Sequence, residues 1–153
     1  MSTDLELMRI SRNNVKELIS DLTQEQLNKI PDGFNNNLIW NIGHLISTTE
    51  LLIYGLTGIE EKLDNDVIKK YRKGTAPAGV VDEAEITALL EKLEAQVDEL
   101  EEDLDSDLFT NTSFQKYPTS FGYTLTNVHE AVQFNSMHEA LHLGYMMAMK
   151  KNV

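Results

Sequence analysis

Apolar residues recur at intervals of three and four positions along most of the chain, and no stretch alternates between apolar and polar residues as a strand does. Because one helical turn takes 3.6 residues, this spacing places the apolar side chains on one face of a helix. The pattern therefore predicts an all-α protein. Four long helices are expected, and they span about residues 3–21, 35–56, 82–103 and 124–150.

Capping residues mark the predicted helix starts. Thr3 with Glu6, and Thr23 with Gln26, have the spacing of a capping box, in which two side chains satisfy backbone groups at a helix start. The second box predicts a short additional helical turn. Two of the long helices begin near other good capping residues, Asn35–Asn37 and Asp82.

The longest irregular stretch lies between Gly58 and Val81, with a short helix expected around Asp66–Tyr71. A connection of this length in a small domain is usually mobile or functional. At 153 residues the chain fits a single domain, 1–153, with one core. Four long helices predict a four-helix bundle, and such bundles build their cofactor sites from inward-facing side chains.

The chain carries 13 basic and 25 acidic residues, which gives a formal net charge of -12. A negative surface repels phosphate backbones and anionic lipid headgroups, so we expect no binding to nucleic acid or membranes. The chain has no cysteine, so histidine and carboxylate groups are the ligands left for a transition metal. The first residues lack the features of a secretory signal, and we expect a soluble, cytoplasmic protein.

His138 and His142 are four residues apart, which places them about 40° apart on a helix at 100° per residue. Both imidazoles can therefore reach one ion. His129 lies roughly 180° away and is excluded from the site. The face of the histidine pair is mostly apolar and is expected to point into the bundle; it carries Ala131, Phe134, Leu141, Tyr145 and Met149.

His44 lies on a helix face that Trp40 and Leu51 mark as buried, while Ser47 and Thr48 leave room beside the ring. A buried imidazole needs partners for both nitrogens, and a metal held with the facing histidine pair would supply one. A hydrogen-bonded core histidine is the alternative for each residue taken singly. Three imidazoles with open coordination positions are typical of a catalytic site.

The segment HEALH at 138–142 also matches the HExxH signature of zinc metalloproteases. Those enzymes commonly take a third ligand downstream. The sequence after His142 contains no His, Asp or Glu, so we reject a protease.

Three stretches of the chain resemble the DinB-like superfamily of metal-binding bundles, the damage-inducible proteins. They are NNNLIWNIGHLISTTELLIYGLTG at 35–58, KKYRKGTAPAG at 69–79 and VHEAVQFNSMHEALHLGYMMAMKK at 128–151. The resemblance implies an up-down-down-up bundle with a long crossover after the second helix. It also implies a divalent metal, commonly zinc or nickel, on His44, His138 and His142. Relatives with known activity transfer groups to or from low-molecular-weight thiols or resemble metal-dependent hydrolases, and many are homodimers.

Two hypotheses follow for the function. In the first, the protein is a metal-dependent thiol transferase or hydrolase. Glu139 is the candidate general base or a group that supports the metal ligands, with an exposed helix carboxylate as the alternative, and Trp40, Thr48 and Tyr145 are candidate substrate contacts. A basic cluster, residues 69–73, could attract an anionic substrate. In the second, it is a non-enzymatic, metal-stabilised dimer or sensor. The opposite face of the last helix is also apolar, with Val132, Ala140, Leu143 and Met147. Either the bundle or a second subunit covers it, and we expect a homodimer.

Overall fold

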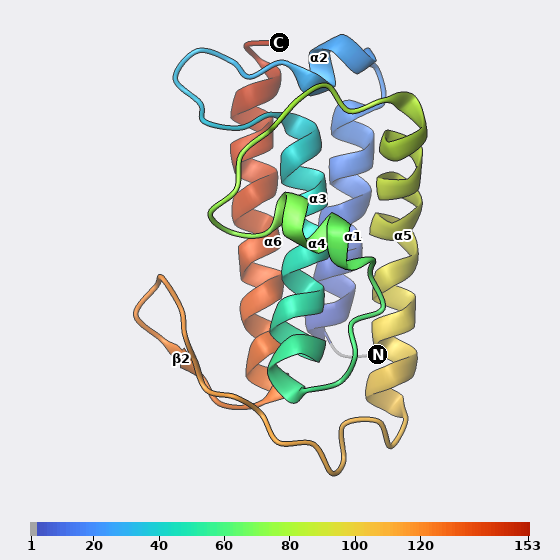
Figure 1. Ribbon diagram of the computed structural model, residues 1–153, viewed down its shortest axis with the longest axis vertical. Helices are drawn as coiled ribbons and strands as arrows, with labels where there is room; N and C mark the ends of the chain where they lie inside the picture. The colour runs from blue at the N-terminus through green and yellow to red at the C-terminus, as the bar shows by residue number, and fades with distance from the viewer. Residues whose placement is uncertain (1–2) are drawn as a thin grey trace.

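The computed structural model describes residues 3–153 and contains a bundle of long helices (Figure 1). The long helices are α1 (Thr3–Ile19), α3 (Leu38–Thr49), α5 (Glu83–Asp105) and α6 (Val128–Lys150). In Figure 1, α1 and α6 run upward while α3 and α5 run downward. Helices α1 and α3 each pack against both α5 and α6. The predicted all-α bundle is therefore confirmed.

The smaller elements lie in the connections. They are α2 (Gln24–Asn28), α4 (Asn65–Tyr71), β1 (Tyr117–Pro118) and β2 (Thr124–Leu125). Strands β1 and β2 pair antiparallel as a short hairpin that Gly122 turns with a φ of 80°. A left-handed φ of this kind costs a glycine little, because it has no Cβ.

The helix starts follow the predicted caps in most cases. Thr23 and Gln26 form the complete capping box at α2, and Asn37 and Asp82 cap α3 and α5. Thr3 is already helical, so it does not cap α1. The predicted start of the last helix at Thr124 was wrong: residues 124–125 form β2, and Asn127 caps α6 by accepting from the backbone N–H of Glu130.

Helix α3 changes its hydrogen-bond pattern before it ends. A π-helical turn (Glu50–Tyr54) and a 3₁₀ turn (Gly55–Thr57) continue its course, and Gly58 ends it in the left-handed conformation. The buried Glu50 accepts hydrogen bonds from the Gln96 side chain at 2.6 Å and from the backbone N–H of Lys62 at 2.9 Å. Glu50 therefore ties the first residues of the crossover to the bundle.

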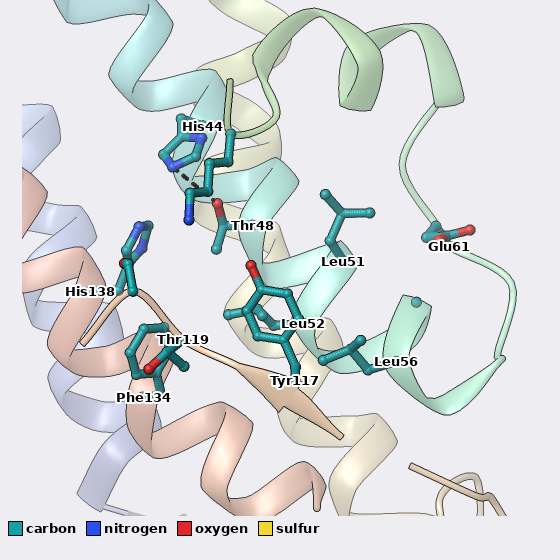
Figure 2. A pocket seen from close by; sticks show the side chains of 13 residues that line it. His44, Thr48, Leu51, Leu52, Leu56, Glu61, Tyr117, Thr119, Phe134 and His138 are labelled. Atoms are coloured by element: carbon teal, nitrogen blue, oxygen red, sulfur yellow. Dashed lines mark hydrogen bonds between the residues drawn. The ribbon is translucent and has the colours of Figure 1, made fainter. Parts of the chain in front are cut away.

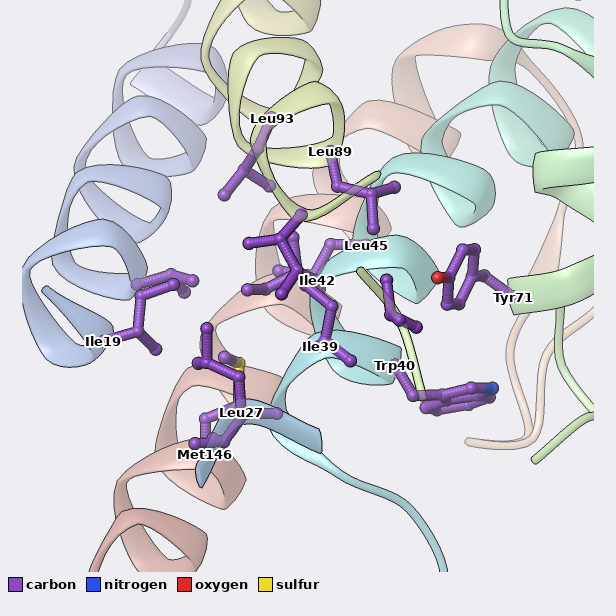
Figure 3. Packing of buried hydrophobic residues seen from close by; sticks show 14 of the residues in the cluster. Ile19, Leu27, Ile39, Trp40, Ile42, Leu45, Tyr71, Leu89, Leu93 and Met146 are labelled. Carbon is purple, nitrogen blue, oxygen red and sulfur yellow. The ribbon is translucent and has the colours of Figure 1, made fainter. Parts of the chain in front are cut away.

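The core surrounds α3, which is buried on nearly every side. Figure 3 shows Ile39, Ile42 and Leu45 of α3 among side chains that come from the other helices. Burial of one such side chain stabilises the fold by about 1.5–3 kcal/mol. A polar residue on α3 must therefore find its partners inside the protein.

The crossover packs against α3 through Tyr71, at the end of α4. A Cβ atom on Gly43 would lie 2.3 Å from Cγ of the Tyr71 ring, so only glycine permits this approach. The Tyr71 hydroxyl donates to Glu85 of α5 at 2.6 Å. The end of α4 is thereby fixed against two bundle helices.

Part of the predicted inward face of α6 is exposed. Ala131 and Met149 are buried, but Leu141 is 56% exposed and Tyr145 is 38% exposed. The histidine pair lies at the edge of the buried side of α6, and these two residues lie beyond that edge. On the opposite face Val132 is buried, whereas the face as a whole is not.

No helix within residues 3–153 combines the length and the apolar character that crossing a membrane requires.

Candidate metal centre

His44 is held on both sides of its ring. The Trp40 indole stacks on the imidazole, with ring centroids 4.7 Å apart and planes inclined by 11°. The Nδ1 atom lies 2.8 Å from the backbone carbonyl of Tyr71. A carbonyl only accepts, so Nδ1 carries the proton and donates it, which leaves a lone pair on Nε2.

His138 and His142 meet one turn apart on α6. Their ring centroids are 4.4 Å apart, and their Nε2 atoms are 3.1 Å apart. The His142 Nδ1–H donates to Oδ1 of Asn41 at 2.8 Å. The orientation of the Asn41 amide follows from its Nδ2, which donates to the backbone carbonyl of Asn37. His142 therefore also has its Nε2 lone pair available.

The three rings come together from α3 and α6. The His44 centroid lies 5.3 Å from that of His138 and 4.9 Å from that of His142. One nitrogen of each ring lies within 4.8 Å of the other two. His129 is exposed elsewhere on α6 and does not belong to this group, as its helical phase predicts.

Burial keeps the three imidazoles neutral. Burial first, and neighbouring cationic groups second, lower the pKa of His138 to about 3. Burial and the nearby His44 lower the pKa of His142 to about 4. Burial also lowers the pKa of His44, although the bond to the Tyr71 carbonyl opposes that effect. Neutral imidazole is the form that binds a metal.

The donor set fits a divalent transition metal. The Nε2 lone pair of His142 faces Nε2 of His138, and Nδ1 of His138 is buried without a hydrogen-bond partner among the described residues. The two Nε2 atoms are within hydrogen-bonding distance of each other, and a cation placed between them would take both as ligands. Zinc and nickel accept imidazole ligands, with Zn–N bonds of about 2.0–2.1 Å, whereas magnesium and calcium prefer oxygen.

A cavity of about 340 Å³ opens beside the histidines. Figure 2 shows His44 and His138 at one side of it, with Leu51 and Leu56 on the other. The apolar wall is completed by Leu52 and Phe134, and polar groups come from the hairpin and the crossover. A small molecule in this cavity would reach His44 and His138 directly.

The predicted substrate contacts occupy different places. Thr48 lines the cavity, and its hydroxyl lies 3.4 Å from Nε2 of His44. Trp40 lies behind His44 and donates its indole N–H to Thr75 at 3.1 Å. Tyr145 packs edge-on against Phe34, with ring centroids 5.1 Å apart. The structure brings Thr48 to the cavity wall and leaves the two aromatic residues outside it.

Glu139 is fully buried, and its carboxylate accepts three hydrogen bonds from Arg12, the shortest at 2.7 Å. Arg12 also donates to the Leu93 carbonyl and to Thr49. Asn135 completes the cluster by donating to Thr49 at 2.9 Å. Glu139 is neither an exposed helix carboxylate nor a residue of the cavity lining.

Sequence reasoning missed two parts of this region. One is Arg12, which is 2% exposed and occupies a position of the buried stripe of α1 between Met8 and Val15. A charged residue in the phase of an apolar stripe was the signal for a buried partner. The other is the wall that the hairpin supplies, Tyr117, Thr119 and Ser120, for which periodicity gives no signal.

The family model of the DinB superfamily matches residues 7–146 of the chain. This range contains His44, His138 and His142, the crossover and the hairpin. No curated protein matches the chain.

Proposed function

The chain belongs to the DinB superfamily, and from that premise we propose that it is a metal-dependent enzyme acting on a small molecule. His44, His138 and His142 hold one divalent ion, zinc or nickel. The reaction is the transfer of a group to or from a low-molecular-weight thiol, or the hydrolysis of a small substrate. The observation that carries the proposal is the convergence of three neutral imidazoles at one side of a cavity of about 340 Å³.

A divalent ion at this position supplies positive charge that lowers the pKa of a water or thiol toward neutrality. The protein's own groups hold the geometry. The Tyr71 carbonyl and the Asn41 amide orient His44 and His142, because each accepts the Nδ1 proton of its histidine. Outer partners of this kind commonly change metal affinity by about 10–100-fold.

Thr48 is the residue we place against the substrate, because its hydroxyl lies in the cavity wall beside His44. Glu139 acts through position instead of proton transfer. Its bonds to Arg12 join α6 to α1 between the two histidines of α6, and so hold that part of the helix in place.

We propose in addition that the protein is a homodimer. Five large apolar side chains on α1 and α6 are each about half exposed: Leu7, Ile10, Met137, Leu141 and Met147. The two helices that carry them pack against each other. An apolar surface of this kind marks a contact with another molecule, and symmetric dimers are the commonest oligomers.

The reaction class can be tested with thiols. Bacillithiol, mycothiol and glutathione would be titrated into metal-loaded protein, with melting temperature and thiol exchange as readouts. Binding of at least one thiol that disappears in His138→Ala supports the transferase. If all three fail to bind and small ester or amide substrates are also untouched, the enzymatic proposal is wrong and a metal-stabilised dimer or sensor takes its place.

A further inference from the structure

Two opposite charges line the cavity, and both come from the crossover, residues 58–81. Lys73 is the lysine and Glu61 the carboxylate among the residues of the described lining. All its other members are histidine, hydroxyl-bearing or apolar residues, or glycine. Neither charge has a hydrogen bond or an ion pair with another residue within 3–153.

Other lysines of the same segment do have such partners. Lys62 pairs with Asp103, Lys69 with Asp66 and Lys70 with Glu85. In a chain with a net charge of -12 carboxylates are abundant, yet Lys73 lines the cavity and forms no ion pair with any residue of the described range. An unpaired charge at a cavity wall is available to a ligand of opposite charge.

Lys73 lies close to the histidines, in a turn whose backbone is held by hydrogen bonds. Its charge acts on both His44 and His138. The next residue, Gly74, adopts a φ of 91°, and the Thr75 hydroxyl then donates back to the carbonyls of the α4 end. Thr75 also accepts from Trp40, the residue that stacks on His44. The backbone beside Lys73 is therefore tied to the same residues that hold His44.

Glu61 lies on the other side of the cavity. Figure 2 shows it across from His138, with Leu51 and Leu56 between them. Its Oε1 atom lies over Gly55, where a Cβ would come within 3.1 Å of it. The following residue donates its backbone N–H to the buried Glu50 at 2.9 Å. Glu61 is thus fixed to the π-helical turn at the end of α3.

We infer that the cavity takes a zwitterionic ligand, an aminocarboxylate whose anionic group is bound by Lys73 beside the histidines and whose ammonium group is bound by Glu61. The apolar atoms between the two charges lie along Leu51, Leu52 and Leu56. This inference rests on the proposed function, in which the cavity is the substrate site, and it adds the chemical class of that substrate. The charges of Lys73 and Glu61 do not themselves depend on a metal.

The probes are 4-aminobutanoate, 6-aminohexanoate and 8-aminooctanoate, each compared with the carboxylate and the amine of the same length. Binding to the whole protein is measured by ligand-observed NMR. At least one zwitterion should bind more tightly than both of its singly charged counterparts, by a factor of about five for one partly exposed charge contact. If no zwitterion is preferred at any length, the inference is overturned.

Charge exchange separates recognition from a structural role. Lys73→Glu and Glu61→Lys should each abolish the preference, and the double variant should restore it because the ligand can bind in reverse. Lys69→Glu, which changes a charge outside the cavity, is the matched control and should change nothing. A double variant that stays folded without regaining the preference contradicts the inference.

Metal content, measured on every variant, distinguishes this inference from the proposed function. Preference for a zwitterion in a protein that binds no metal would refute the metal centre and leave the ligand class standing. A full complement of metal without any preference for a zwitterion would support the metal centre and overturn the ligand class.

Discussion

Two polar clusters lie within one turn of each other on α6, and they are built in opposite ways. In the first, every nitrogen of the Arg12 guanidinium donates a hydrogen bond, and both oxygens of Glu139 accept one. In the second, the nitrogens of His138 and His142 face each other at 3.1 Å, beside a cavity. Glu139 follows His138 in the sequence, yet it is bonded to Arg12 and does not line the cavity.

The difference separates a structural cluster from a binding site. A buried polar network whose charges are paired with each other holds one arrangement of the helices, whereas imidazole nitrogens that converge beside a cavity can take a ligand. Sequence adjacency hides this distinction, because a step of one residue turns the side chain by 100° about the helix.

The largest loss of stability is expected from breaking the Arg12–Glu139 cluster. Arg12→Met leaves the Glu139 carboxylate buried without its charged partner and should lower the free energy of unfolding by about 3–5 kcal/mol. The double variant Arg12→Met/Glu139→Leu should recover most of that loss, since no charge remains buried. Urea denaturation of both variants measures the difference, and equal losses would mean that the ion pair is not what Arg12 contributes.

Two asparagines allow the clusters to be tested separately. Asn41→Ala removes the acceptor of the His142 Nδ1 proton and should weaken metal binding by about 10–100-fold. Asn135→Ala removes a member of the Arg12–Glu139 cluster and should lower stability with metal affinity unchanged. Competition with a metallochromic chelator gives the affinities. Equal effects of both variants on metal binding would remove the distinction between the clusters.

The pH dependence of metal binding follows from the lowered pKa values of the histidines. Since burial holds the pKa of His138 at about 3 and that of His142 at about 4, protons do not compete for these nitrogens near neutrality. Burial also lowers the pKa of His44, so metal affinity should fall much less between about pH 7.5 and about pH 5 than it would for exposed imidazoles. Three exposed histidines with a pKa near 6.5 would lose on the order of 10⁴-fold.

In the metal-free protein, each of the three histidines makes the fold less stable as the pH falls. The folded pKa lies below the unfolded value, so the unfolded chain binds protons first. The metal-free protein should lose stability as the pH falls from about 6.5 toward about 3. A metal-free protein that becomes more stable over this range would contradict the buried, neutral state of the rings.

The smallest effect on the fold is expected on the outward face of α6. Leu141→Lys adds a charge to the proposed dimer surface and should shift the protein to monomers in sedimentation experiments. The stability of the monomer should change by less than about 0.5 kcal/mol, because this side chain is exposed. Leu108→Lys is a control at an exposed leucine in the connection that follows α5. A monomeric wild-type protein would refute the dimer.

The helical spacing of apolar residues was enough to predict the all-α fold and the inward position of the three histidines. The helical phase placed His138 and His142 together, excluded His129 and put His44 on a buried face with Trp40 and Leu51, and the resemblance to the family implied the same three ligands. Periodicity defines the direction of a side chain on its own helix and says nothing of which helix it meets. For that reason Glu139 could be placed on α6 without any hint of Arg12, which lies 127 residues away.

The cavity could be predicted only in part. Thr48 and His44 share a helical face, and that face does line it. Lys73 and the hairpin residues reach it from segments without regular structure, whose path depends on single contacts such as the Tyr71 ring over Gly43. Such contacts join distant residues and leave no period in the sequence.

Metal content of the untagged protein tests the central claim most directly. Elemental analysis would compare the wild type with His44→Ala, His142→Ala and the control His129→Ala. We expect about one zinc or nickel ion per chain in the wild type and the control, no ion in the other two variants, and a lower melting temperature after chelation. A wild-type protein without metal at micromolar supply, or binding that neither substitution affects, would contradict the three-histidine site.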